Sequence, residues 1–349
     1  MKPINYIQVI KTTDAELKGY ANLADEVKSE ILPLFELTRS RISKRVPEGS
    51  IYRRLENIKE SVGENPFILD LTSHEDLMNY QIEELLDDED GFSAWTNFVE
   101  SLEIESLIPA IHVYQDGDPE DVVKQVERLS ASFESVAFRI GADDTDLDFY
   151  LRSIKRGLRN EDQLLVIVDA EFITEWDYSA KKNDLEQKIS FLNREVPNAS
   201  VSICGSSFPK SVKDSSAGSD AYGKLPIYEY AIFSELSADH PNLIYGDYAS
   251  IHPVRYQAGG GNWVPRIDYP LDDFIIYYRF RRDEGSYPRC AQELVDDSDF
   301  DDLACWGTEQ IYSALSGEPN GKSPSFWIAV RLNIHITRKV RSLTQRIIL

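Results

Sequence analysis

The sequence predicts an α/β protein folded as a (β/α)8 barrel, and two observations carry that prediction. Short apolar runs rich in Val, Ile, Leu, Phe and Tyr alternate about eight times with longer segments of helical spacing. These units end by about residue 250, the length that such barrels commonly span. An open, doubly wound parallel sheet is the alternative, because periodicity does not distinguish a closed ring from a twisted sheet.

Most of the predicted strands are nearly continuous in apolar character, as expected of parallel strands covered on both faces. They are Tyr6–Ile10, Ile31–Leu37, Phe67–Leu71, Leu107–Val113, Ser135–Ile140, Leu164–Val168, Ala199–Cys204 and Leu243–Tyr245. Between them, Asp118 followed by Pro119 is typical of a helix cap with a proline in the first turn. The predicted helices are Asp14–Lys28, Ile51–Val62, Tyr80–Leu86, Phe92–Leu102, the segment after Asp118, Asp146–Leu158, Ala180–Arg194 and Pro226–Leu236.

The texture changes after the eighth unit. Residues Trp263–Arg282 read as a hairpin, with one face made by Phe274, Ile276, Tyr278 and Phe280. We therefore expect an antiparallel insertion at 255–285, followed by closing helices at Gln310–Leu315 and Ser325–Leu343. Because no linker separates these parts, residues 1–349 are expected to form a single barrel domain.

Composition narrows the class of protein. The chain has 349 residues, 42% of them apolar, which is enough to bury a large core. Its net charge of -23 disfavours general nucleic-acid binding. The sequence shows neither an apolar run long enough for a membrane helix nor a signal peptide, so we expect a soluble, cytoplasmic protein without a membrane partner. Three scattered cysteines predict neither a disulfide framework nor a sulfur-ligated zinc site.

Polar side chains stand where the predicted strands end. In a barrel those ends meet at one mouth, and buried charges there must be neutralised by each other, by water, by a metal or by a ligand. Mixed charges favour a ligand site over helix caps alone, although a salt-bridged plug without catalysis is the alternative. The residues are Lys11, Glu36, Asp70, His112, Arg139, Asp169, the turn Cys204–Ser207 and Asp247.

The types of these side chains suggest phosphoester chemistry. Carboxylate oxygens are the ligands that Mg²⁺ or Mn²⁺ prefers, and Lys11 with Arg139 can hold a phosphate or carboxylate. His112 is a candidate general acid or base, against the alternative of a hydrogen-bonded core histidine. The candidate metal ligands, which with His112 form the candidate catalytic set, are Glu36, Asp70, Asp169 and Asp247.

Two further segments were weighed for function. Ser206 and Ser207 lack a Gly-x-Ser-x-Gly elbow, so they are candidate hydrogen-bond donors to a ligand and not nucleophiles. The stretch from Arg331 to Leu349 is basic without an acidic residue, which suits a docking surface or a nucleic-acid track, or else a last helix paired with the acidic body. Its basic residues are Arg331, Arg338, Lys339, Arg341 and Arg346.

A set of short motifs spread along the chain resembles the beta-protein family, named for a tailed-phage protein. The resemblance runs across nearly the whole chain, and order and spacing carry it. The motifs are Pro33–Glu36, Leu69–Leu71, Phe138–Ile140, Val168–Asp169, Gly205–Pro209, Tyr245–Tyr248, Cys305–Gly307, Phe326–Trp327 and His335–Thr337.

The resemblance implies a single-domain barrel of phages and bacterial genomes, often encoded beside mobile-element or phage-defence genes, and it implies no reaction. It coincides with Glu36, Asp70, Arg139, Asp169, Asp247 and His335, and its motifs add Tyr248 to the candidate ligand-binding residues. We therefore expect a phage-related or anti-phage defence protein that binds a phosphorylated or nucleotide-like ligand at the barrel mouth. One hypothesis is that it hydrolyses this ligand with a metal ion, as a phosphodiesterase or related hydrolase. The alternatives are a non-catalytic sensor or adaptor for a protein of the same defence system, and a nuclease that uses the basic segment.

Overall fold

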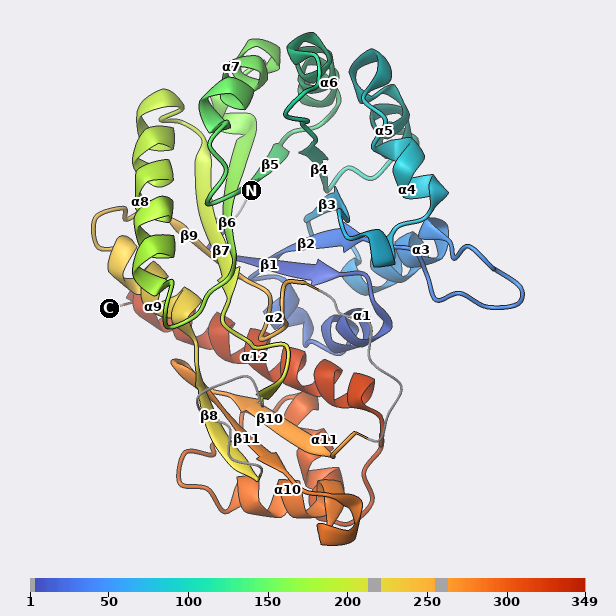
Figure 1. Cartoon of the computed structure of the whole chain (residues 1–349), viewed down its shortest axis with the longest axis vertical. Helices are drawn as coiled ribbons and strands as arrows, with labels where there is room; N and C mark the ends of the chain where they lie inside the picture. Colours follow the sequence, from blue (N-terminus) through green and yellow to red (C-terminus); the bar gives the residue numbers. More distant parts are fainter. Residues whose placement is uncertain (1–3, 213–220, 255–262, 349) are drawn as a thin grey trace.

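The computed structural model describes residues 4–212, 221–254 and 263–348, and its main body is a closed barrel of eight parallel strands (Figure 1). This confirms the predicted (β/α)8 fold over the open sheet. The order around the ring follows the chain, and β9 closes it by pairing with both β7 and β1. The strands are β1 (Tyr6–Lys11), β2 (Leu32–Leu37), β3 (Phe67–Leu71), β4 (Leu107–Ile111), β5 (Val136–Gly141), β6 (Leu164–Phe172), β7 (Ser200–Ser206) and β9 (Ile244–Asp247).

Alternation along each strand divides the apolar residues between two cores. Ile7 and Val9 of β1 belong to a cluster inside the barrel, whereas Tyr6 and Ile10 belong to the larger cluster between the barrel and its helices. Because neighbouring side chains on a strand point to opposite faces, a shift of one residue moves a side chain from the barrel interior to the helix layer.

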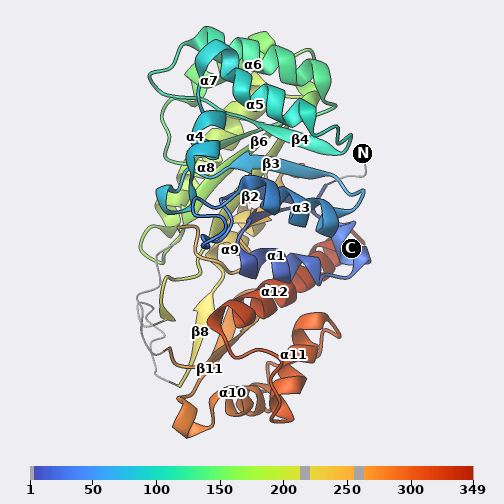
Figure 2. The same ribbon diagram turned by 90° about the vertical axis from the view of Figure 1, so that its right-hand side faces the viewer.

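Helices cover the outside of the barrel (Figures 1 and 2). The Asp118 side chain accepts a hydrogen bond from the Glu120 amide at 2.9 Å and so caps α6, with Pro119 in the first turn as predicted. The helices that follow the strands are α1 (Asp14–Ala21), α2 (Asp25–Lys28), α3 (Ile51–Val62), α4 (Tyr80–Leu85), α5 (Glu89–Ser101), α6 (Pro119–Ser132), α7 (Leu147–Gly157), α8 (Tyr178–Glu195) and α9 (Tyr228–Leu236).

A small antiparallel sheet lies beside the barrel. Strands β10 (Arg266–Pro270) and β11 (Phe274–Arg279) form the predicted hairpin, while 255–262 of the expected insertion fall outside the described residues. The sheet has a third strand that the sequence did not predict, β8 (Tyr222–Pro226), which pairs with β11. Pro226 therefore ends a strand, and the helix expected to begin there begins at Tyr228.

Three helices complete the described chain, and the last of them packs against both the small sheet and the barrel. They are α10 (Ser286–Val295), α11 (Trp306–Leu315) and α12 (Pro324–Ile348). On α12, Val330 and Ile334 pack in the cluster under the small sheet, while Leu332 and Ile336 pack in the barrel cluster. This long helix therefore runs between the two parts, as Figures 1 and 2 show. Among the described residues, none of the helices has the length and apolar character that crossing a bilayer requires.

Gly19 shows how closely α12 approaches α1. A Cβ at this position would lie 2.7 Å from the Leu332 side chain and 2.8 Å from the Ala329 carbonyl oxygen, so only glycine fits without a shift of the backbone. The Asn333 side chain donates a hydrogen bond to the Gly19 carbonyl at 3.2 Å and fixes the crossing.

Candidate functional site

Seven side chains from different strand ends converge at the carboxyl end of the barrel, and we call them the mouth cluster. The pairing register sets Lys11 beside Glu36 and Glu36 beside Asp70, so the first three strands deliver their charges side by side. The mouth cluster consists of Lys11, Glu36, Asp70, His112, Arg139, Asp169 and Tyr248. The predicted strand ends supplied the first six, and the family motifs supplied Tyr248.

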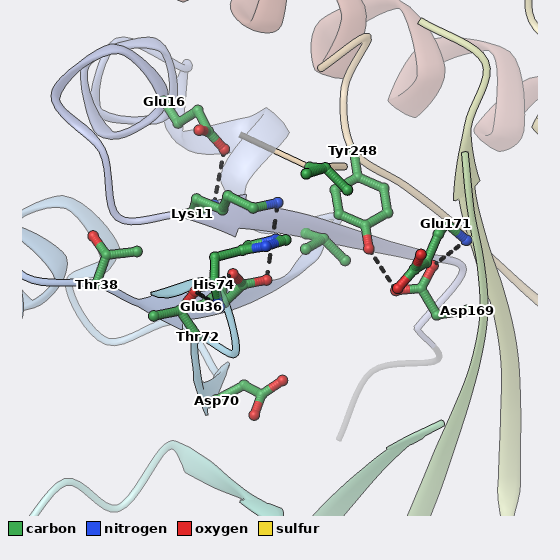
Figure 3. Close-up of polar contacts among 12 residues, drawn as sticks. Lys11, Glu16, Glu36, Thr38, Asp70, Thr72, His74, Asp169, Glu171 and Tyr248 are labelled. Atoms are coloured by element: carbon green, nitrogen blue, oxygen red, sulfur yellow. Dashed lines mark hydrogen bonds and ion pairs between the residues drawn. The ribbon is translucent and has the colours of Figure 1, made fainter. Parts of the chain in front are cut away.

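Arg139 is the centre of the mouth cluster. Its Nη1 lies 3.1 Å from Glu36 Oε2 and 3.4 Å from Asp70 Oδ2, and its Nε donates to Asp169 Oδ2 at 2.9 Å. Its Nη2 donates to the Tyr248 hydroxyl at 2.6 Å. That hydroxyl in turn donates to Asp169, as Figure 3 shows. One guanidinium therefore holds three carboxylates together, which is the arrangement expected when buried charges must be paired.

Glu36 lies deepest of the three carboxylates. Burial by itself would raise its pKa, but Lys11 and Arg139 outweigh that effect and lower the pKa to about 2. The Thr72 hydroxyl donates to Glu36 Oε1 at 2.8 Å and strengthens the same preference (Figure 3). Glu36 is therefore ionised at neutral pH and is a hydrogen-bond acceptor, not a proton donor.

The ammonium group of Lys11 is the least satisfied group of the mouth cluster. The residue is 2% exposed, and Nζ makes no hydrogen bond within the described part of the chain. Its nearest opposite charge is Glu36 Oε2 at 3.9 Å, and it lies 4.8 Å from the centre of the Tyr248 ring (Figure 3). A buried ammonium is costly in free energy unless its donors are paired, so Lys11 Nζ is able to take an acceptor from a bound molecule.

Besides Lys11 Nζ, the mouth cluster has one more buried nitrogen of interest, in the ring of His112. Nε2 is buried and has no hydrogen-bond partner among the described residues, while Nδ1 lies 3.9 Å from Asp70 Oδ1. The ring packs edge-on against Trp95, with 5.0 Å between the ring centres. Burial lowers the pKa of His112, against the opposing effect of Asp70, so the ring is neutral at pH 7. A neutral imidazole can donate to or accept from a bound molecule.

Asp247 does not point into the mouth. Ile244 and Tyr248 pack inside the barrel, so the alternation of β9 turns Asp247 to the helix layer, where it is fully buried. There it belongs to a second group of polar side chains, which we call the outer cluster. The outer cluster consists of Tyr6, Tyr245, Asp247, Ser250 and His335.

Each carboxylate oxygen of Asp247 has two hydrogen-bond partners. Oδ1 accepts from the Tyr6 hydroxyl and the Ala249 amide, both at 2.8 Å, and Oδ2 accepts from Tyr245 at 2.8 Å and lies 2.7 Å from His335 Nε2. Burial alone would raise the pKa of Asp247, but His335 and these hydrogen bonds lower it. The other ring nitrogen of His335 lies 2.6 Å from Ser250 Oγ. Asp247 and His335 therefore join β9 to α12 on the outer side of the barrel.

The two serines of the seventh strand end separate in the same way. Ser206 continues the inward face of Cys204, and its hydroxyl accepts from the Phe208 amide at 3.2 Å. Ser207 instead points toward α9, where its hydroxyl lies 2.7 Å from Glu229 Oε2 and its amide donates to the same oxygen at 2.9 Å. Of the two predicted ligand donors, only Ser206 is on the side of the mouth.

Comparison with known proteins identifies the family of this chain. The sequence profile of the family described as Beta protein matches residues 6–341. The chain belongs to the Beta protein family. It is 29% identical over 342 residues to Protein beta of Enterobacteria phage P4, covering 96% of this chain and 93% of the phage protein.

A solved structure is also similar to this Beta protein family member over much of its length. It is the spore cortex-lytic enzyme SleL of Bacillus megaterium, with a TM-score of 0.36 and 11% sequence identity, covering 94% of this chain and 73% of the enzyme. At that score and identity the likeness carries no argument about function.

The carboxylates of this Beta protein family member do not fit the predicted magnesium or manganese site. The Arg139 guanidinium lies among Glu36, Asp70 and Asp169, where a shared cation would have to sit. The fourth predicted ligand, Asp247, lies on the other face of β9. Within 4–212, 221–254 and 263–348, no group of three or more His, Cys, Asp or Glu side chains could hold a metal ion.

The basic segment near the end of the chain is largely buried. Arg331, Arg338 and Lys339 are 3%, 8% and 0% exposed, and the first two pair with Asp268 and Asp301. Among the four whose side chains are described, Arg341 is exposed, and the side chain of Arg346 falls outside the described residues. A helix that pairs with the acidic body agrees with this arrangement, whereas the nucleic-acid track needs these cations at the surface.

Two residues of the mouth region were missed by sequence reasoning. Thr72 supports Glu36, and Glu16 accepts the Lys11 amide at 2.8 Å with Oε2 (Figure 3). Glu16 had a recognisable signal, because Thr13 and Glu16 have the spacing of a helix capping box. Thr72 had none beyond its place just after a predicted strand.

Proposed function

We propose that the barrel mouth binds a small phosphorylated or nucleotide-like ligand. The observation that carries the proposal is the Lys11 ammonium, which is buried and lacks a hydrogen-bond acceptor among the described residues. A ligand oxygen would supply the missing acceptor and remove most of the cost of burying this group. His112 Nε2, free in the same cluster, supplies a second contact.

In this proposal Arg139 organises the mouth and does not grip the ligand. Its nitrogens are engaged by Glu36, Asp70, Asp169 and Tyr248, so the role expected for it from the sequence passes to Lys11 and His112. Counted as formal charges, the two cations and three carboxylates of the mouth sum to about -1. Such a mouth favours the hydroxyl-bearing or base part of a ligand over its phosphate.

The test is ligand binding by the whole protein with Lys11 replaced by methionine, which keeps the length of the side chain. A panel of nucleotides and sugar phosphates is screened by thermal shift, and hits are titrated by calorimetry, because a ligand that binds only the folded state raises its melting temperature. Lys11→Met is expected to weaken a hit at least tenfold, since a hydrogen bond to a charged group contributes about 1.5 to 3 kcal/mol.

Lys28→Met is the matched control. Lys28 is also buried, but it lies before β2, at the opposite end of the barrel, and its ammonium donates to the Ala21 carbonyl at 3.2 Å. This variant should bind as the wild type does. If no compound of the panel binds, or if Lys11→Met binds as tightly as Lys28→Met, the proposal is wrong.

A further inference from the structure

A hollow of about 500 Å³ lies beside the mouth, between the first turns of α1 and α3 and the loop that leaves β2. A volume of this size accommodates a small-molecule ligand. We call it the arginine hollow. The side chains that matter to its chemistry are Asp14, Ser40, Arg41, Ser43, Arg53 and Arg54.

Three guanidinium groups meet a single carboxylate in the arginine hollow. Arg54 is 7% exposed; its Nη1 binds Asp14 at 2.6 Å, and its Nε has no partner among the described residues. Arg41 and Arg53 are exposed, and no ion pair or hydrogen bond engages either of them in the part of the chain that the structure describes. The hollow therefore carries an excess of about two positive charges in a protein whose net charge is -23.

We infer that the arginine hollow binds the phosphate group of the ligand whose remainder lies in the mouth, an inference that rests on the proposed function. A guanidinium offers paired N–H donors that match the spacing of phosphate oxygens, and it stays charged at any physiological pH. Helix α3 adds its positive end, because Arg53 and Arg54 belong to its first turn; the Ser50 side chain does not cap it, and Gln81 Oε1 accepts from the Ile51 amide at 3.1 Å. The free Nε of the buried Arg54 is the donor that a bound oxygen would satisfy.

The chain keeps the arginine hollow within reach of the mouth. Asp14 follows Lys11 by three residues, and such a segment spans at most about 11 Å when fully extended. Ser40 lies four residues after Glu36, in the loop that follows β2. A hydrogen bond of 3.0 Å between the hydroxyls of Thr12 and Thr38 joins this loop to the loop that follows β1. One molecule can therefore place a hydroxyl at Lys11 and a phosphate in the arginine hollow.

Inorganic pyrophosphate is the probe that tests this inference, because it has no sugar or base to bind elsewhere. Titration calorimetry at low salt is expected to show binding to the wild-type chain, and at least tenfold weaker binding to the double variant Arg41→Gln, Arg53→Gln. The control is Arg152→Gln, Arg194→Gln, which removes the same charge from two exposed arginines of α7 and α8 and should bind as the wild type does.

The inference is overturned if pyrophosphate does not bind, or if the two double variants weaken it equally. A nucleotide or sugar phosphate found in the mouth screen separates the two proposals. If Lys11→Met weakens that ligand and Arg41→Gln, Arg53→Gln does not, the mouth binds it without the arginine hollow and this inference fails alone. If only the arginine variant weakens it, the arginine hollow binds phosphate independently and the proposed function of the mouth fails.

Discussion

The mouth cluster and the outer cluster lie on opposite faces of the barrel strands. They differ in how far their buried charged groups are hydrogen-bonded. In the outer cluster, Asp247 accepts from four donors and both nitrogens of His335 have partners. In the mouth cluster, the carboxylates are paired through Arg139, but Lys11 Nζ and His112 Nε2 have no hydrogen bond among the described residues.

The difference separates scaffold from site. The hydrogen bonds of the outer cluster hold β9 and its turn to α12, and they engage Asp247 and both ring nitrogens of His335. Buried donors without a hydrogen bond, such as Lys11 Nζ, lower the free energy of unfolding, and binding sites commonly carry such groups. Both clusters contain buried charged side chains, so charge and burial do not distinguish them. The hydrogen bonding of their buried donors does.

The largest expected effect comes from breaking the centre of the mouth cluster. Arg139→Met leaves Glu36, Asp70 and Asp169 buried without their common counter-ion. Removing one partner of a buried ion pair costs about 3 to 5 kcal/mol, so the free energy of unfolding in urea at pH 7 should fall by that amount.

Arg152→Met is the control, because Arg152 pairs with Asp148 on the exposed surface of α7. Its loss should be within about 0.5 kcal/mol of zero. A loss below about 1 kcal/mol for Arg139→Met would mean that the three carboxylates are satisfied in another way, and that the mouth is more open than the structure implies.

A second prediction concerns Glu229, which lies beside the outer cluster. Burial raises its pKa to about 7, with Ser207 opposing and Asp247 adding to the shift. The folded state thus holds this proton more tightly than the unfolded state, whose glutamate has an ordinary pKa near 4.5. The contribution of this group to stability is therefore complete below pH 4.5 and is lost as the pH rises through 7.

Glu229→Gln removes that dependence. Unfolding free energies of the variant and the wild type are compared at pH 4 and pH 8, and the difference should shift by about 3 kcal/mol in favour of the variant at pH 8. Glu235→Gln on the same helix is the control, because Lys182 lowers the pKa of exposed Glu235 and the small shift should have the opposite sign. Equal pH profiles for Glu229→Gln and the wild type would contradict the prediction.

Apolar periodicity predicted the barrel because each of its strands is a local signal. Strand β8 gave no comparable signal, since Tyr222–Pro226 alternates weakly and is a strand only through its pairing with β11. Two residues were expected to face the mouth but point to the outer side of the barrel, one position away from an inward-facing neighbour. They are Asp247 and Ser207. Each neighbours a residue that does face inward, Tyr248 and Ser206, and the sequence alone does not fix where the pleat ends.

The predicted charges of the mouth were the right residue types, but their partners could not be predicted. Arg139 and Asp169 come from adjacent strands, whereas Glu36 lies on a distant strand and reaches Arg139 across the mouth. Only the closed ring brings them together. For the same reason the sequence suggested a metal where the structure has a guanidinium, because spacing along the chain does not show which cation lies between carboxylates.

The smallest expected effect tests whether the outer cluster is only scaffold. Ser250 has a positive φ of 60°, unusual for a residue with a side chain, and its hydroxyl lies 2.6 Å from His335. Ser250→Ala loses the hydrogen bond and keeps the strain, so the free energy of unfolding should fall by about 1 kcal/mol. Ser250→Gly loses the same bond but relieves the left-handed strain, so it should be about 1 kcal/mol more stable than Ser250→Ala. Both should bind a mouth ligand with wild-type affinity. A weaker affinity of the folded variants would show that the outer cluster affects the site through Tyr248.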